Sequence, residues 1–315
     1  MSYLSTVLIT GGSSGLGYET ALQLAQPHLH LQIVIAARTG TEAAETINQT
    51  SRQSNVTYIK LDLSSHSTTQ TFVEEYLSKG FPPISALILN AGHQSCFKVQ
   101  FSPDGEELMF AINHVNHALL FFLLKDRLVN DARIILISSS THDPARKRVP
   151  PPDFTSGEAA AHPSTGKQYD TIAEGNRRYA LSKLCNVLFA YAIHDNKTRP
   201  WIVMALDPGV MPTGLYRWLP WPVSSIFRWY FSSIIGQYFI KDLYQTSYVA
   251  ETLCKMATSP EFGDPAKSGK YYGVVGAKEI KSSVQSYEKG LQGELWDWTV
   301  REMAKGDEVE TFHVL

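Results

Sequence analysis

The chain has 315 residues, of which 43% are hydrophobic, and a formal net charge of −2. This composition is typical of a globular protein with a sizeable core, and the balanced charge argues against a nucleic-acid-binding protein. Three scattered cysteines (Cys96, Cys185 and Cys254) match neither a disulfide framework nor a zinc site. A strand-like run starts at Thr6, which leaves no room for a signal peptide, and no apolar run reaches the length of a spanning helix. We therefore expect a cytoplasmic protein.

Short apolar runs alternate with longer helical patterns along the chain. The predicted strands are 7–10, 32–37, 57–61, 86–89, 133–138, 202–206 and 270–273. The predicted helices are 15–26, 40–51, 67–79, 104–129 and 179–197. Strands rich in Ile, Val and Leu without polar alternation are buried on both faces, as in a parallel sheet covered by helices. The pattern therefore predicts an α/β fold with a doubly wound parallel sheet, forming a single domain over residues 1–315.

Two segments interrupt this alternation. Residues 141–178 are polar and rich in Pro and Gly, and we interpret them as a long inserted loop. Residues 212–240 are aromatic and apolar, a composition consistent with a lid over a bulky apolar ligand. Two alternatives remain for residues 216–240, which are peripheral contact with a membrane surface and ordinary core packing.

A glycine-rich turn follows the first predicted strand and leads into the first predicted helix. Its key positions are Gly11, Ser13, Ser14, Gly15, Leu16 and Gly17. Glycine lets the backbone approach a pyrophosphate, and the helix N-terminus supplies unpaired N–H groups. A plain tight turn is the alternative, but the strand–turn–helix order favours a dinucleotide site.

The end of the second strand bears on the choice of cofactor. An NAD site requires a carboxylate near this point to bind the ribose hydroxyls, but Ala37 stands there. Arg38 comes next, and its guanidinium can pair bidentately with a 2′-phosphate. The sequence therefore favours NADP(H) over NAD(H).

Tyr179 and Lys183 are four residues apart in a helical pattern, which places both side chains on one face. Free tyrosine titrates near pH 10, too high for proton transfer at neutral pH. An ammonium about 4 Å away is worth up to about 4 kcal/mol at an effective dielectric of 20, or about three pK units. The pair therefore predicts a catalytic acid–base tyrosine assisted by a lysine.

The Thr10-initiated Gly-x-x-x-Gly-x-Gly turn and Tyr-x-x-x-Lys together resemble the short-chain dehydrogenase/reductase family. The resemblance implies a Rossmann fold and further cofactor contacts. Asp62 and Leu63 meet the adenine, Asn90, Ala91 and Gly92 form the floor, and Pro208, Gly209 and Thr213 contact the nicotinamide end.

The resemblance also implies two further catalytic residues. Asn113 supports a water chain to the lysine, and Ser139 bonds the reacting carbonyl oxygen, with Ser138 and Ser140 as alternatives. Ser139 and Tyr179 are forty positions apart, a long connection that is similar to the retinol-dehydrogenase-like and protochlorophyllide-reductase-like branches.

These features predict an NADPH-dependent reductase of a ketone or aldehyde on a lipophilic or polycyclic molecule, such as a retinoid, steroid or secondary metabolite. The reverse reaction, NADP⁺-dependent alcohol oxidation, uses the same groups. A non-catalytic NADP(H)-sensing protein and a methyltransferase are further alternatives, although neither requires Tyr-x-x-x-Lys. We expect no metal site among the ten histidines. The family resemblance leaves a homodimer open.

Overall fold

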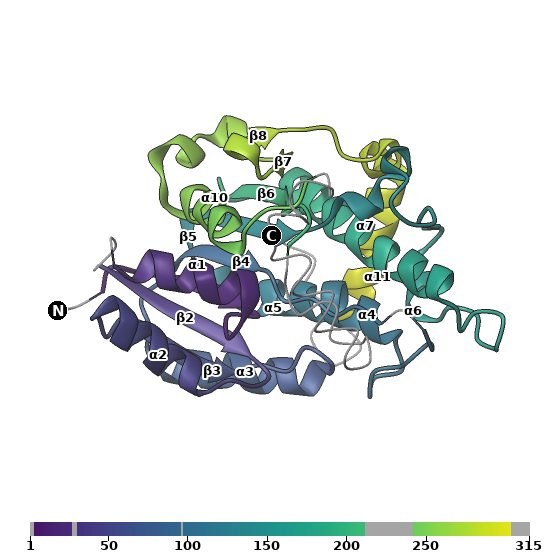
Figure 1. The fold of residues 1–315 in the computed structure, drawn as a ribbon. Helices are drawn as coiled ribbons and strands as arrows, with labels where there is room; N and C mark the ends of the chain where they lie inside the picture. Colours follow the sequence, from purple (N-terminus) through teal and green to yellow (C-terminus); the bar gives the residue numbers. More distant parts are fainter. Residues whose placement is uncertain (1–2, 27–29, 96, 212–241, 304–315) are drawn as a thin grey trace.

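The computed structural model describes residues 3–26, 30–95, 97–211 and 242–303. The described residues form one eight-stranded sheet with the order β3-β2-β1-β4-β5-β6-β7-β8 (Figure 1). All neighbours are parallel except β7 and β8, which are antiparallel. The strands are β1 (Ser5–Thr10), β2 (Leu31–Ala37), β3 (Val56–Lys60), β4 (Ile84–Leu89), β5 (Leu128–Ile137), β6 (Ile202–Asp207), β7 (Lys270–Gly273) and β8 (Lys278–Glu279).

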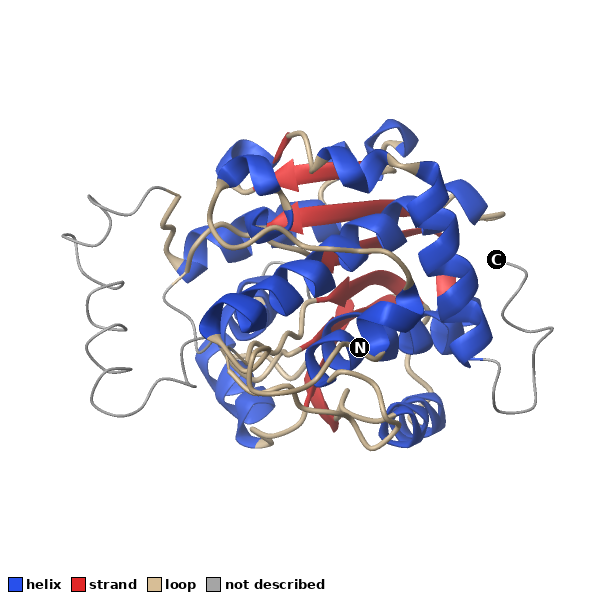
Figure 2. Cartoon of the chain, turned by 90° about the vertical axis from the view of Figure 1, so that its right-hand side faces the viewer, coloured by secondary structure: helices blue, strands red, loops and turns tan. Residues whose placement is uncertain are grey.

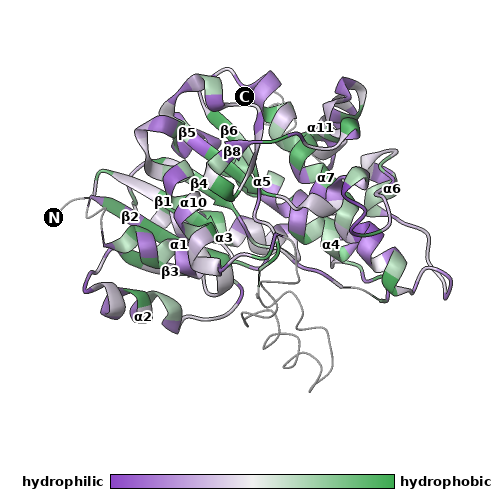
Figure 3. Cartoon of the chain, turned by 45° about the horizontal axis from the view of Figure 1, so that its top comes forward, coloured by the Kyte–Doolittle hydropathy of each residue, from purple (hydrophilic) through white to green (hydrophobic). Residues whose placement is uncertain are grey.

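Helices cover both faces of this sheet (Figure 2). One face packs against α1 (Gly15–Ala25), α2 (Glu42–Ser51) and α10 (Thr246–Thr258). The other packs against α3 (His66–Ser78), α5 (Asn116–Leu124) and α7 (Ile172–Asn196), and α11 (Lys289–Met303) lies on α7. The shorter helices are α4 (Leu108–Phe110) and α6 (Gly157–Ala161). Two hydrophobic cores result, one on each side of the central strands. Figure 3 shows hydrophobic residues along the central strands.

The predicted α/β doubly wound fold is confirmed, and all seven predicted strands are present. β2 shows why the strands could be predicted from their apolar runs, because all seven of its residues are buried. The sequence prediction omitted β8, α10 and α11. β8 has only two residues, both exposed, so no apolar run marks it.

The predicted helix over 104–129 was too long. It begins as α4, passes through a π-turn at Ala111–Val115 and ends as α5 at Leu124. In the π-turn the Asn116 N–H donates to the Ala111 carbonyl, five residues back rather than four. β5 then begins at Leu128, earlier than predicted, and Leu128 pairs with Ile84 of β4.

The interpretation of 141–178 as a loop was also wrong in part. This segment contains α6, and α7 begins at Ile172 rather than at Tyr179. Thr171 caps α7, because its Oγ1 accepts the N–H of Glu174, the pattern of an N-terminal capping box. Tyr179 therefore lies inside a helix rather than at its first turn.

Residues Leu108–Arg127 are long and apolar enough to cross a membrane, but 83% of the window that qualifies is buried inside the fold. We assign this segment to the protein core. The predicted lid over 212–240 and Thr213 lie outside the described residues.

Candidate active site

A cleft of about 490 Å³ opens at the carboxyl ends of the central strands, where the strand order reverses between β1 and β4. Ligands of open α/β sheets bind at this kind of switch point. The sequence-predicted residues among those that line it are Gly11, Ser13, Ser14, Gly15, Leu16, Arg38, Asp62, Leu63, Asn90, Ala91, Gly92, Tyr179, Lys183 and Pro208. Residues from six separate stretches of the chain therefore meet at one site.

The glycine turn packs closely against neighbouring backbone. A Cβ at Gly11 would stand 2.9 Å from the Ala91 Cα, and one at Gly17 would stand 2.5 Å from the Gly11 carbonyl oxygen. Only glycine fits either position. Ser14 precedes α1 without capping it through its side chain, and the first turn carries no acidic residue. The first amides of α1 are thus left for an anionic group, so these residues fit a dinucleotide.

Arg38, at the end of β2, lines the cleft. Its side chain is exposed and forms no ion pair within the described parts of the chain. Ala37 beside it is 8% exposed and offers no carboxylate. Asp62 also lines the cleft, and its Oδ1 accepts the Ser64 N–H at 3.0 Å.

The floor of the cleft is tied to β1 through Thr10. The Asn90 and Ala91 N–H groups both donate to Thr10 Oγ1, at 2.9 and 3.0 Å. The Asn90 side-chain amide donates to the Thr10 carbonyl at 2.8 Å. Gly92 follows directly, and a Cβ there would be 3.5 Å from Lys183 Nζ. The floor therefore leads straight to the predicted catalytic lysine.

Tyr179 and Lys183 lie together on α7 and both line the cleft. Lys183 Nζ is 5.8 Å from the centroid of the Tyr179 ring and donates to the Ile137 carbonyl at 3.1 Å. Burial lowers the pKa of Lys183 to about 8. The Lys183 ammonium is therefore held next to the Tyr179 ring by the carbonyl at the end of β5. Its burial disfavours the charged form.

Asn113 lies in the π-turn and is completely buried. Its Oδ1 accepts the His93 N–H at 2.7 Å, while its Nδ2 donates to the His93 carbonyl and to Ser182 Oγ. Ser182 Oγ in turn donates to the Tyr179 carbonyl at 2.8 Å. The side chain of Asn113 thus joins the loop after the cleft floor to the helix that carries Tyr179.

The three serines at the end of β5 have different partners. Ser138 is 1% exposed, and its Oγ donates to the Lys183 carbonyl at 2.8 Å. Ser139 is half-buried, and its Oγ accepts the Thr141 N–H at 3.3 Å. The Ser140 N–H donates to Asp207 Oδ1 at 3.2 Å. Ser138 lines the cleft, but its hydroxyl hydrogen is committed to the backbone.

Ser139 is not among the described residues that line the cleft, but its hydroxyl only accepts in the bond above, and it stays the predicted donor to the substrate carbonyl. Ser139→Ala is expected to lower kcat about 10²–10³-fold, the usual effect of removing one donor to a developing oxyanion. Ser138→Ala is expected to act mainly on stability, costing about 1 kcal/mol for one buried hydrogen bond. Steady-state rates and thermal melting of both variants measure these effects. The assignment is wrong if Ser138→Ala loses more activity than Ser139→Ala.

Comparison with known proteins agrees with this geometry. The sequence pattern of the short chain dehydrogenase family matches residues 5–150. The polyprenol dehydrogenase of Danio rerio is 30% identical over 302 residues, covering 92% of this chain and 83% of that protein. The chain belongs to the short-chain dehydrogenase family. Human retinol dehydrogenase 14 is 28% identical in sequence, covering 93% of this chain and 84% of that protein. This similarity places the short-chain dehydrogenase on the retinol-dehydrogenase-like branch.

A solved structure shows the same fold. The crystal structure of an uncharacterised protein from Mycobacterium paratuberculosis superposes with a TM-score of 0.68 and 22% identity, covering 96% of this short-chain dehydrogenase and 94% of that chain.

Several residues that the sequence analysis did not single out line the cleft or support it. His93, Gln94, Ile112 and Met211 line it. His142 supports it, because its Nδ1 lies 2.6 Å from the Ser139 carbonyl oxygen and its Nε2 accepts the Ser283 N–H at 3.1 Å. A signal for His93 was available, because it follows Asn90-Ala91-Gly92 directly. Nothing local marks His142, because Ser283 is far away in the sequence.

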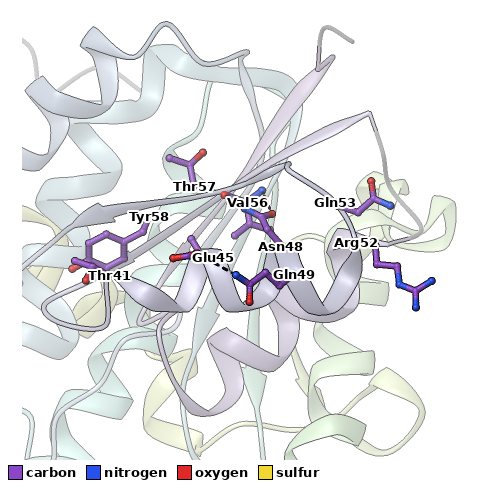
Figure 4. Close-up of a pocket in the computed structure, with 10 residues that line it drawn as sticks. Thr41, Glu45, Asn48, Gln49, Arg52, Gln53, Val56, Thr57 and Tyr58 are labelled. Atoms are coloured by element: carbon purple, nitrogen blue, oxygen red, sulfur yellow. Dashed lines mark hydrogen bonds between the residues drawn. The ribbon is translucent and has the colours of Figure 1, made fainter.

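A second hollow lies away from this cleft, between α2 and β3 (Figure 4). Several of its polar side chains pair with each other or with the backbone. Gln49 Nε2 donates to Glu45 Oε1. Asn48 Nδ2 donates to the Val56 carbonyl, and Asn48 Oδ1 accepts the Val56 N–H. It offers no group suited to catalysis, so we place no function there.

Among the described residues, one histidine lies close to two carboxylates. His66 Nε2 is 3.1 Å from Glu106 Oε1, and the His66 N–H donates to Asp104. Burial lowers the pKa of His66, but the hydrogen bond and charge of Glu106 outweigh it and raise the pKa overall. We interpret this group as an ion pair that holds the start of α3.

Proposed function

We propose that this short-chain dehydrogenase reduces a ketone or aldehyde of a lipophilic small molecule with NADPH. The observation that carries the proposal is the single cleft in which the glycine turn, Arg38, Tyr179 and Lys183 meet. A dinucleotide with its pyrophosphate on α1 and its 2′-phosphate at Arg38 would run along this cleft towards Tyr179.

The bound nicotinamide would supply the hydride, and the protein residues supply position and charge. Ser139 would donate a hydrogen bond to the substrate oxygen. Tyr179 would give its phenol proton to that oxygen as negative charge develops on it. Lys183 would stabilise the resulting phenolate, and Asn113 would hold the helix of Tyr179 in register through Ser182.

The lipophilic substrate class rests on two features. Residues 212–240 are rich in aromatic and apolar side chains. The relatives are named for a polyprenol and for retinol, both of which are lipophilic alcohols. The same names favour alcohol oxidation with NADP⁺ as the second candidate, since the groups at the site serve both directions. A retinoid, a steroid and a secondary metabolite are the substrates to screen first.

Cofactor choice is the sharpest test of this proposal. We expect NADPH to bind at least about tenfold more tightly than NADH, because one charge-assisted phosphate contact is worth about 1.5–3 kcal/mol. Arg38→Ala should remove this preference by weakening NADPH alone. Isothermal titration calorimetry with both dinucleotides measures it. Equal dissociation constants in the wild type would remove the role of Arg38 and the choice of NADP(H).

A screen of carbonyl compounds separates the enzyme from its alternatives. NADPH consumption with any member of the panel supports the reductase, whereas NADPH binding without turnover supports a nucleotide-sensing protein. Cytosolic location, a homodimer and contact of residues 216–240 with a membrane remain proposals. Sedimentation of the purified chain tests the dimer, and flotation with liposomes tests membrane contact.

A further inference from the structure

His117 lies beneath the cleft floor and is outside the set of residues used above. It belongs to α5 and is 2% exposed. Its Nδ1 lies 3.1 Å from the Asn113 carbonyl oxygen, and its Nε2 lies 2.9 Å from Thr10 Oγ1. One imidazole therefore bridges the π-turn of the predicted catalytic asparagine and the strand end that holds the cofactor floor.

The partners of His117 determine its tautomer. A carbonyl oxygen can only accept, so Nδ1 must carry the hydrogen that goes to Asn113. Burial, aided by the positive charge of Lys183, lowers the pKa of His117 to about 4, so the ring is neutral and has no second N–H. Nε2 must therefore accept a hydrogen bond from the Thr10 hydroxyl.

The same reasoning fixes the Thr10 hydroxyl. Its hydrogen goes to His117 Nε2, and its two lone pairs accept the N–H groups of Asn90 and Ala91. The competing acceptor is the Ile88 carbonyl oxygen, at a longer 3.4 Å. If the Thr10 hydroxyl donated to Ile88 instead, its oxygen would face the unprotonated Nε2 of His117 with no hydrogen between them. Moving the ring hydrogen to Nε2 would leave the unprotonated Nδ1 facing the Asn113 carbonyl oxygen. The arrangement with His117 as acceptor satisfies every group.

We propose that His117 is a positioning residue that couples the cofactor floor at Asn90-Ala91 to the π-turn carrying Asn113. This rests on the proposed function, because the coupling matters only if a dinucleotide lies on that floor. The chain of contacts runs from the floor through Thr10 and His117 to the Asn113 backbone. From there the Asn113 side chain reaches Ser182 and the helix of Tyr179.

His114, which lies in the π-turn next to Asn113, provides a matched control. It is 1% exposed, burial lowers its pKa to about 3, and its Nε2 lies 3.1 Å from the Thr299 hydroxyl. Thr299 belongs to α11, which the cleft does not include. His114→Asn and His117→Asn thus remove the same ring from similar surroundings, but only the second breaks the contact with Thr10.

The first measurement is the tautomer, read from the ring ¹⁵N shifts of the full-length wild type without cofactor. We expect a neutral Nδ1–H imidazole between pH 5 and pH 8, with the signal assigned by its loss in His117→Asn. An Nε2–H tautomer or a protonated ring would overturn the proposal. This result does not depend on cofactor binding, so it is separate from any failure of the proposed function.

The second measurement is the dissociation constant of NADPH. We expect His117→Asn to raise it about tenfold, the effect of one lost buried hydrogen bond, and His114→Asn to change it less than about twofold. Both variants should melt at lower temperatures, so melting alone does not distinguish them. Equal dissociation constants for the two variants would contradict the proposal. If the folded wild type binds no dinucleotide, the proposed function and this coupling both fail.

A double-variant cycle with Thr10→Val tests the route of the coupling. If His117 acts on the floor through Thr10, His117→Asn in the Thr10→Val background should weaken NADPH binding less than about twofold further. Full additivity of the two effects would show that His117 does not act through Thr10, and would refute the proposed route.

Discussion

Tyr179→Phe is expected to lower kcat by about 10²–10⁴-fold, the range contributed by one general acid. The side chain is 6% exposed and lines the cleft, so the phenylalanine ring fills the same space. The dissociation constant of NADPH should therefore change less than about threefold, since only one hydroxyl is lost. Stopped-flow or steady-state oxidation of NADPH, together with calorimetric binding, measures both quantities.

Tyr191→Phe is the control for this variant. Tyr191 is buried on the same helix, and its hydroxyl pairs with Ser282 Oγ at 2.8 Å, away from the cleft. We expect this control to lose stability but to keep the wild-type kcat. Retention of substantial turnover by Tyr179→Phe would remove the proton-transfer role from that residue.

Lys183→Met is expected to abolish most turnover while making the cofactor-free protein more stable at pH 7. The gain should be about 1–3 kcal/mol, because a buried ammonium is replaced by an apolar chain of similar length. The Ile137 carbonyl keeps a partner, since Asn186 Nδ2 also donates to it at 3.0 Å. Differential scanning calorimetry should show a higher melting temperature in the variant.

The pH dependence of this stability difference checks its cause. Burial lowers the pKa of Lys183 from 10.5 to about 8, so between these values the unfolded chain binds more protons than the folded chain. Wild-type stability from this group therefore rises with pH across that window. The advantage of Lys183→Met should be full below about pH 8 and should vanish towards pH 10.5. A difference independent of pH would mean that packing, rather than charge burial, sets it.

The parts of the site that sequence predicts well are those with a local pattern. Gly11 and Gly17 stand out because the glycine-rich turn directly follows the first apolar run and precedes a helical pattern. β2 was predicted because both of its faces are buried, which leaves an unbroken apolar run. Tyr179 and Lys183 were paired because helical spacing alone puts them on one side.

The parts that the sequence did not predict depend on contacts between distant segments. The serine run at the end of β5 looks uniform, but Lys183 and Asp207 give Ser138 and Ser140 different partners. The helix around Asn113 contains no proline or glycine that would mark an irregularity, yet it contains a π-turn. Nothing in the local sequence distinguishes His117 from the other nine histidines, because its partner Thr10 lies 107 residues away.

The sequence by itself determined most of the order of strands and helices, the glycine turn and the spacing of the catalytic pair, because each leaves a pattern within a short stretch of residues. Only the tertiary structure decided which hydroxyls face a ligand and how His117 joins the cofactor floor to the π-turn. Those assignments depend on which buried donors and acceptors meet across the sheet, and no local periodicity encodes that pairing.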